Sequence, residues 1–182
     1  MQTDSDRFFI LTGGPGSGKT TLIESLRAAG YRSSVEAGRG IIQDQVAISG
    51  PALPWNDPAL FAELMLSWEM RSHDIAMQET GPVFFDRGVP DVIGYLRLTG
   101  LPVPAHIEKA AEAFRYNRKV FVLPPWPEIF HPDAERKQDL DEARRTYEAM
   151  VETYAEYGYE LITVPPAPVQ ERLSFVLAKA GF

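Results

Sequence analysis

FFILTGGPGSGKTT, residues 8–21, is the stretch of sequence that decides the fold. Its apolar half is too short for a buried helix and stops at glycines, so we predict a buried strand over residues 7–12. The next eight residues match the pattern G-x-x-x-x-G-K-[ST] in full. Leu22, Ile23 and Leu26 then recur at helical spacing and Gly30 stands where a helix C-cap belongs, which predicts a helix over residues 19–29. Strand, glycine loop and helix are the context that this pattern requires.

The glycine loop predicts a site for the phosphates of a purine nucleoside triphosphate. Glycines allow successive backbone N–H groups to curl around phosphate oxygens, and the N-terminus of the following helix adds positive potential. We expect Lys19 to reach the β- and γ-phosphates and the Thr20 hydroxyl to ligate Mg²⁺, with Thr21 nearer the α-phosphate. The predicted nucleotide-binding residues are therefore Gly13, Gly14, Pro15, Gly16, Ser17, Gly18, Lys19, Thr20 and Thr21.

The composition suits one globular domain over residues 1–182, since 45% of the residues are hydrophobic and 24% are charged. There is no cysteine, and the three histidines form no ligand spacing, so any metal is expected to have oxygen ligands. A net charge of −7 disfavours broad nucleic-acid binding and fits a small-molecule partner better. The N-terminus lacks the features of a signal peptide and no apolar run reaches membrane-spanning length, so we expect a cytoplasmic protein.

Strand and helix patterns alternate along the rest of the chain. Short apolar runs predict strands at 31–35, 83–85, 119–123 and 161–164. Helical periodicity predicts further helices over about 38–47, a long segment opening at Asp57-Pro58, 90–98, 104–117, 139–157 and 168–180. In the long helix, a single apolar stripe is predicted to face the core, formed by Phe61, Leu64, Met65, Trp68 and Ile75. Five strands alternating with helices predict an α/β fold with a mostly parallel sheet that is covered on both faces.

Charged residues follow the predicted strand 83–85. The run Pro82 to Asp86 has the shape of a Walker-B strand, whose final carboxylate holds the metal through water. Asp86 is alternatively a base that accepts a proton from an acceptor hydroxyl, and the sequence leaves both roles open. Arg87 either contacts anionic groups of a substrate or pairs with a neighbouring acid.

Further candidates for acceptor binding lie at the same predicted edge of the sheet. Glu36 ends the predicted strand 31–35, and ligands of open α/β sheets bind outside the carboxyl ends of the strands. Arg39 lies one helical turn further on, although an acid at a helix N-terminus and a solvated arginine explain this pair equally well. Asp91 and Tyr95, four residues apart, either face the same pocket or serve as an N-terminal acid and a core tyrosine.

A segment rich in prolines and cations at about 124–138 predicts a lid after the fourth strand. A mobile arginine that closes over the γ-phosphate stabilises charge and excludes water, which a kinase needs. Arg136 is the candidate for a catalytic role. Arg144 and Arg145 are further candidates, although a solvated helix face paired with nearby acids is the interpretation that we favour for them.

The chain resembles the small P-loop ATPases with the AAA-type domain of nucleoside- and nicotinamide riboside-kinase-like proteins. The resemblance rests on the glycine loop, the strand end Asp86-Arg87-Gly88 and the proline-rich segment, and it extends over nearly the whole chain. It implies a three-layer αβα P-loop fold similar to nucleoside monophosphate kinases, with strand order 2-3-1-4-5. The positions that match this group include Glu36, Arg39, Asp86, Arg87, Asp91, Tyr95 and Arg136.

Two other kinds of nucleotide-binding protein are disfavoured. Asp91-Val92-Ile93-Gly94 spells D-x-x-G but lies past the strand end, and no Asn-Lys-x-Asp motif occurs, so ATP is expected rather than GTP. The chain also leaves no room for the helical lid domain of a hexameric AAA+ motor.

Three functions are compatible with these motifs. The leading hypothesis is a phosphotransferase that moves the γ-phosphoryl group of ATP to a hydroxyl or phosphate of a small acceptor. The alternative is a nucleotide-switched regulatory ATPase without an acceptor. A polynucleotide end-kinase would need a basic groove, and the acidic balance counts against it. The sequence does not indicate an oligomeric state.

Overall fold

The computed structural model describes residues 4–129 and 139–182 of the chain. Five strands form one sheet in the order β2-β3-β1-β4-β5, and all four pairings between neighbours are parallel. The predicted α/β class and the strand order 2-3-1-4-5 are therefore confirmed. The strands are β1 (Phe8–Gly13), β2 (Arg32–Ser33), β3 (Val83–Asp86), β4 (Lys119–Leu123) and β5 (Glu160–Thr163).

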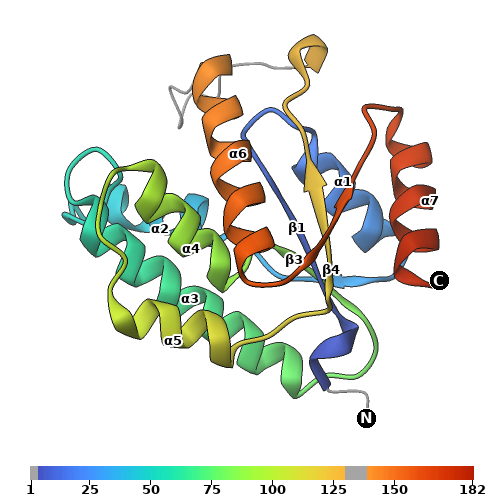
Figure 1. Cartoon of the computed structure of the whole chain (residues 1–182), viewed down its shortest axis with the longest axis horizontal. Helices are drawn as coiled ribbons and strands as arrows, with labels where there is room; N and C mark the ends of the chain where they lie inside the picture. The colour runs from blue at the N-terminus through green and yellow to red at the C-terminus, as the bar shows by residue number, and fades with distance from the viewer. Residues whose placement is uncertain (1–3, 130–138) are drawn as a thin grey trace.

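Helices cover both faces of the sheet, which gives three layers (Figure 1). The described helices are α1 (Lys19–Ala28), α2 (Ala37–Ala47), α3 (Pro58–Met77), α4 (Val89–Leu98), α5 (Ala105–Ala113), α6 (Leu140–Glu156) and α7 (Val169–Ala180), with short 3-10 turns η1 (Asp4–Arg7) and η2 (Pro127–Ile129). Helices α1 and α7 lie on one side of the sheet, and α3 to α6 lie on the other (Figure 1). In the described part of the chain, none of the helices is both long and apolar enough to cross a membrane.

Alternating side chains of the central strands build the two halves of the core. Phe8 and Ile10 of β1 point toward α3, α4, α5 and α6, whereas Phe9 and Leu11 point toward α1 and α7. All four are at most 4% exposed. Because each central strand is apolar on both faces, the sequence reads as a continuous apolar run, as is typical of parallel strands between two helical layers.

Local signals explain where the elements begin and end. The carboxylate of Asp57 accepts a hydrogen bond from the Leu60 backbone N–H at 2.9 Å and starts α3, as its position before Pro58 predicts. Helix α5 is shorter than predicted and ends at Ala113. The chain must turn there, because the Asn117 N–H donates to the Phe8 carbonyl oxygen at 2.7 Å and leads directly into β4.

The apolar stripe predicted for α3 is wrong in part. Phe61 is buried, but Ile75 is 46% exposed. The buried face beyond Phe61 contains Leu66 together with the polar residues Glu69 and His73. The apolar periodicity therefore predicted a helix face that is rotated away from the face that is buried in the structure.

Candidate functional site

The glycine loop between β1 and α1 is enclosed by backbone from two other elements. Gly13 has a positive φ of 149°, and a Cβ atom built there would collide with the carbonyl oxygen of Leu123 at the end of β4. A Cβ atom on Gly14 would collide in the same way with the carbonyl oxygen of Ala143 in α6. Only glycine fits these two positions. The backbone of the loop therefore packs directly against Leu123 of β4 and Ala143 of α6.

A cavity of about 470 Å³ opens along this loop. The groups that border it come from four parts of the chain: the loop itself, the ends of β2 and β3, the segment after β4, and the start of α7. Its lining residues are 14–21, Glu36, Arg87, Trp126, Ile129, Ala167, Pro168, Val169 and Arg172. The structure thus brings all of the predicted nucleotide-binding residues except Gly13 to the same cavity as Glu36 and Arg87, two of the residues predicted to bind an acceptor.

Lys19 and Asp86 form an ion pair and hydrogen bond at the base of the loop. Each residue is 6% exposed. Strands β1 and β3 are neighbours with Leu11 opposite Asp86, which brings the carboxylate to the start of α1. The Asp86 backbone N–H donates to the Ser34 hydroxyl at 2.9 Å, so the end of β2 also fixes this position. Sequence reasoning did not single out Ser34.

Arg87 lies between two acids, Asp91 in the first turn of α4 and Glu36 at the N-cap of α2. Its Nη1 is 3.2 Å from Asp91 Oδ1, and its Nε is 3.8 Å from Glu36 Oε1. Burial by itself would lower the pKa of Arg87, but the carboxylates of Asp91 and Glu36 outweigh it and raise the pKa. Arg87 also has a positive φ of 72°, which is uncommon for a residue with a side chain. Arg39 is linked to the same group, with its Nε 3.9 Å from Glu36 Oε2.

Asp91 points into the protein rather than into the cavity. Its Oδ1 accepts hydrogen bonds from the Thr12 hydroxyl and from Arg87. Its Oδ2 accepts from the Gly88 backbone N–H at 2.9 Å and from the Tyr154 hydroxyl at 2.5 Å. Both oxygens therefore hold the start of α4 against β1 and α6. The hydrogen bond from Arg87 to Oδ1 also orients the Arg87 side chain.

Tyr95 is also absent from the lining of the loop cavity. Its ring packs against Phe61 of α3 with the ring centroids 5.4 Å apart. The hydroxyl is buried without a hydrogen-bond partner in the described part of the chain, and burial raises the pKa of Tyr95 to about 12. The structure thus supports the core interpretation of Tyr95 and leaves its hydroxyl without an assigned role.

The predicted lid arginines have different outcomes. Arg136 lies outside the described residues, so its role stays a prediction. Arg144 and Arg145 are exposed on α6, and Arg144 Nη1 is 3.7 Å from Asp141 Oδ1. This arrangement is a solvated helix face, which is the interpretation favoured from the sequence.

Arg172 of α7 is a site residue that sequence reasoning missed. Its Nη2 donates to the Ser17 carbonyl oxygen at 2.9 Å and its Nη1 donates to the Gly18 carbonyl oxygen at 3.3 Å. The guanidinium also lies 5.4 Å from the ring centroid of Trp126. Arg172 is 3% exposed, and burial lowers the pKa of its side chain. The sequence does contain a signal for this role: Arg172 is a charged residue four positions before Val176, on an otherwise apolar helix face.

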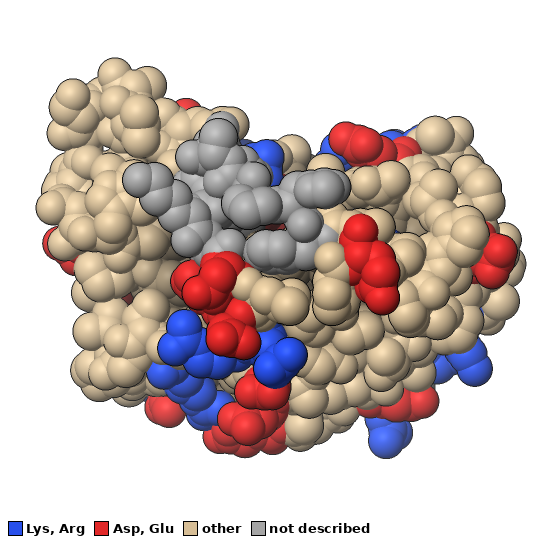
Figure 2. Space-filling model, turned by 90° about the horizontal axis from the view of Figure 1, so that it is seen from above, with Lys and Arg blue, Asp and Glu red and all other residues tan. Residues whose placement is uncertain are grey.

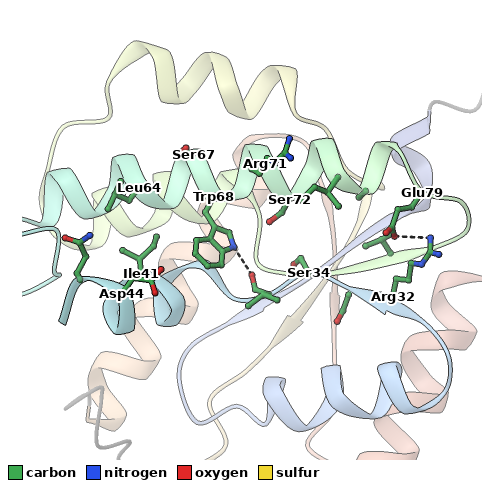
Figure 3. A pocket seen from close by; sticks show the side chains of 16 residues that line it. Arg32, Ser34, Ile41, Asp44, Leu64, Ser67, Trp68, Arg71, Ser72 and Glu79 are labelled. Carbon is green, nitrogen blue, oxygen red and sulfur yellow. Dashed lines mark hydrogen bonds and ion pairs between the residues drawn. The ribbon is translucent and has the colours of Figure 1, made fainter. Parts of the chain in front are cut away.

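A second cavity of about 670 Å³ lies beside the edge strand β2, between α2 and α3 (Figure 3). Trp68 from α3 and Ile41 from α2 form its walls, and an ion pair between Arg32 and Glu79 closes one end. The Trp68 indole N–H donates to the Val35 carbonyl oxygen at 3.3 Å. This cavity contains no residue of the glycine loop, so the larger of the two cavities is not the predicted nucleotide site.

Charges at the carboxyl ends of the strands are mixed. Figure 2 looks onto this side, and the visible Lys and Arg side chains lie in small groups next to Asp and Glu. The described part of this face therefore shows no broad basic surface of the kind that a polynucleotide strand requires.

The donor set at the loop fits a hard metal ion. Thr20 lines the cavity with an exposed side chain, and Asp86 presents carboxylate oxygens next to Lys19. Mg²⁺ prefers oxygen ligands and commonly takes the remainder from phosphates and water. Among the described residues, no group of three or more His, Cys, Asp or Glu side chains is arranged to hold a metal by itself.

Several solved structures have a similar fold. A crystal structure of NadR protein in complex with NR is 18% identical with a TM-score of 0.72, and the match covers 98% of this chain and 52% of NadR. The chain thus spans about half the length of NadR. Thymidylate kinase from Ehrlichia chaffeensis is 13% identical with a TM-score of 0.64, covering 98% of this chain and 100% of that one. Deoxyadenosine kinase from M. mycoides with bound dATP is 14% identical with a TM-score of 0.57, covering 96% and 99%.

These likenesses show a P-loop fold of the nucleoside and nucleotide kinase type. No curated protein matches the chain by sequence. A family model described as an AAA domain matches residues 8–172, which is most of the chain. The protein therefore belongs to this AAA-domain family of P-loop proteins.

Proposed function

We propose that the protein is a Mg²⁺- and ATP-dependent phosphotransferase that acts on a small-molecule acceptor. One observation carries the proposal: Glu36 and Arg87 line the same cavity as the phosphate loop. A nucleotide switch needs a phosphate loop and groups that respond to the γ-phosphate, but it does not need a second set of charged groups open to that phosphate. A kinase needs such groups in order to orient an acceptor.

The donor side follows from the loop. Backbone N–H groups of residues 14–19 and the N-terminus of α1 would bind the phosphates, and Lys19 would leave Asp86 to reach the β- and γ-phosphates. Thr20 and Asp86 would hold Mg²⁺, which neutralises the charge that develops on the transferred group. Trp126 and Pro168 also line the cavity and would contact the purine.

The acceptor side is assigned to Glu36, Arg39 and Arg87. In the transfer, a bond forms between the acceptor oxygen and the γ-phosphorus while the bond from that phosphorus to the bridging oxygen of ADP breaks. The acceptor proton passes to a carboxylate, for which Glu36 and Asp86 are the candidates. Arg87 would orient the acceptor oxygen or bear part of the charge on the transferred group.

Nucleotide turnover measured with and without a panel of acceptors tests the proposal. The panel contains nucleosides, riboside cofactors, nucleoside monophosphates and small alcohols, and Lys19→Ala serves as the control for contaminating kinases. We expect at least one acceptor to stimulate ADP release and to become phosphorylated, and Glu36→Gln to reduce this stimulation. Turnover that no acceptor changes would instead identify a regulatory ATPase.

A further inference from the structure

The indole of Trp68 contacts both ends of the segment 35–40. Its N–H donates to the Val35 carbonyl oxygen at 3.3 Å. Its six-membered ring lies so close to Gly40 that a Cβ atom built on this glycine would be 2.7 Å from the ring. In Figure 3 the Trp68 side chain points from α3 toward the chain that follows β2, and the dashed line marks the hydrogen bond. One side chain of α3 thus holds this segment at two points.

Two of the residues assigned to the acceptor lie inside this segment. Glu36 is the N-cap of α2 and lines the cavity of the glycine loop. Its Oε1 is 3.8 Å from Arg87 Nε, and its Oε2 is 3.9 Å from Arg39 Nε. A side chain can be no better placed than the backbone that carries it, so contacts that fix the backbone on either side of Glu36 also fix its carboxylate relative to the loop.

The sheet does not hold Val35 in place. The Ser34 N–H still donates to the Phe84 carbonyl oxygen at 3.0 Å, but β2 itself ends at Ser33. The Val35 side chain is 59% exposed. Among the described residues, only Trp68 donates a hydrogen bond to Val35. Trp68 therefore supplies the main-chain contact between the last strand pairing and the start of α2.

Filling the core does not by itself explain an indole at this position. Trp68 is only partly buried, because it also lines the second cavity of about 670 Å³ beside β2. The core next to it contains Ile41 and Phe61, which are at most 4% exposed. A residue needed for packing alone requires no N–H group, whereas the N–H of Trp68 is directed at one carbonyl oxygen.

We propose that Trp68 is a positioning residue of the acceptor site that acts through Glu36. The indole holds the segment 35–40 at its two ends, so that the Glu36 carboxylate meets the acceptor from a fixed direction. Trp68 is not among the residues that line the cavity of the glycine loop, so its effect falls on the acceptor rather than on the nucleotide. This inference rests on the proposed function and deepens it, because it assigns to α3 a part in acceptor binding.

Two substitutions disturb the contact from opposite sides. Trp68→Phe removes the N–H and shortens the ring. Gly40→Ala retains the indole but adds a Cβ atom that displaces it, although alanine favours a helix more than glycine does. We expect each variant to raise the acceptor KM about tenfold while the ATP KM stays within about twofold, because positioning losses fall on acceptor binding. Gly40→Ala thus tests the contact independently of any stability that Trp68→Phe loses.

The double variant tests whether both substitutions act through the same contact. A shorter ring at position 68 leaves room for the added Cβ atom, so Gly40→Ala should have a much smaller effect in the Trp68→Phe background than in the wild type. The control is Ile75→Ala, because Ile75 also lines the second cavity from α3 and is 46% exposed. This control should leave both KM values unchanged.

An unchanged acceptor KM in Trp68→Phe overturns the inference, and so do fully additive effects in the double variant. A parallel rise of both KM values with a lower melting temperature also overturns it, since this would mark a general structural role. The wild-type protein is assayed first with the acceptor panel. If no acceptor stimulates its turnover, the proposed function fails and the inference falls with it. Acceptor-dependent turnover that Trp68→Phe leaves intact refutes the inference alone.

Discussion

Lys19 and Asp86 form a buried ion pair that joins the start of α1 to the end of β3. Lys19 would otherwise be an uncompensated cation in a nearly closed environment, which is costly. In the proposed function, Lys19 would exchange this carboxylate for phosphate oxygens when a nucleotide binds. The same exchange would free Asp86 to hold a metal ion or to accept a proton, which are the two roles proposed for it.

Asp86→Asn is predicted to separate binding from turnover. The amide of the variant binds Lys19 less strongly than the carboxylate does, so nucleotide affinity should be retained or improved. The turnover rate should fall about 100-fold or more, because the carboxylate is lost. Titration with a fluorescent ATP analogue and steady-state turnover measure the two effects, and Lys19→Ala should lose both. Unchanged turnover in Asp86→Asn would remove this residue from the site.

Arg172→Ala is predicted to damage the phosphate loop from outside it. The variant removes the two hydrogen bonds to the carbonyl oxygens of Ser17 and Gly18, and we expect a loss of about 2 kcal/mol in the free energy of unfolding. Nucleotide affinity should fall as well. Thermal and urea denaturation with and without ATP check this prediction. Arg144→Ala, an exposed arginine on α6, is the control and should change stability by less than about 0.5 kcal/mol. Equal stability of the two variants would contradict the proposed support of the loop.

The bounds of a strand were predicted best where a local sequence pattern alone determines them. The strand at 119–123 was predicted with its observed bounds, and the strand at the glycine loop with a shift of one residue, because both are apolar runs between clear breaks. The strand predicted at 31–35 is observed as Arg32–Ser33 only. It pairs with β3 alone, and the Val35 carbonyl oxygen is taken by Trp68 of α3. That contact depends on the tertiary structure and leaves no mark in the local pattern.

The site was predicted in the same uneven way. The loop and the strand ends follow from motifs, and the parallel sheet brings Glu36 and Arg87 to it. Arg172 escaped notice because it is one charged residue on an apolar helix face, and a search for helical periodicity treats such a residue as an exception. Its hydrogen bonds to the glycine loop depend on the tertiary structure.

Gly14→Ala is predicted to act through stability rather than through the nucleotide alone. The added Cβ atom meets the Ala143 backbone, which cannot move without shifting α6, and we expect a loss of about 3 kcal/mol or more. Gly100→Ala is the comparison, because a Cβ atom there meets open space although φ is 72°. Its cost should be limited to backbone strain of about 1–2 kcal/mol. Chemical denaturation without nucleotide separates the two variants, and equal losses would contradict the steric argument.

His73 is predicted to make stability dependent on pH. Burial lowers the pKa of His73 below its ordinary value of 6.5, although the hydrogen bond to the Arg115 carbonyl opposes this. The unfolded chain therefore binds a proton more readily than the folded one, so the stabilising contribution is present above pH 6.5 and is lost as the pH falls from that value through the lowered pKa of the folded state.

The measurement is urea denaturation of wild type and His73→Phe between pH 7.5 and 5. The variant preserves the aromatic contacts and should show a weaker decline than wild type toward low pH. His106→Gln changes an exposed histidine and should retain the decline attributed to His73. If the stability of His73→Phe fell with pH as steeply as that of the wild type, the pH dependence would belong to other groups.

The hydrogen bonds of Asp91 bear on any attempt to change the proposed acceptor specificity. Its two oxygens are occupied by Thr12, Gly88, Arg87 and Tyr154, so variation there tests whether the chain folds before it tests what the site selects. A combinatorial library aimed at new specificity should therefore keep Asp91, Thr12 and Tyr154 constant. Diversity is better placed at Glu36, which lines the cavity of the glycine loop, and at Arg39, whose side chain is 41% exposed.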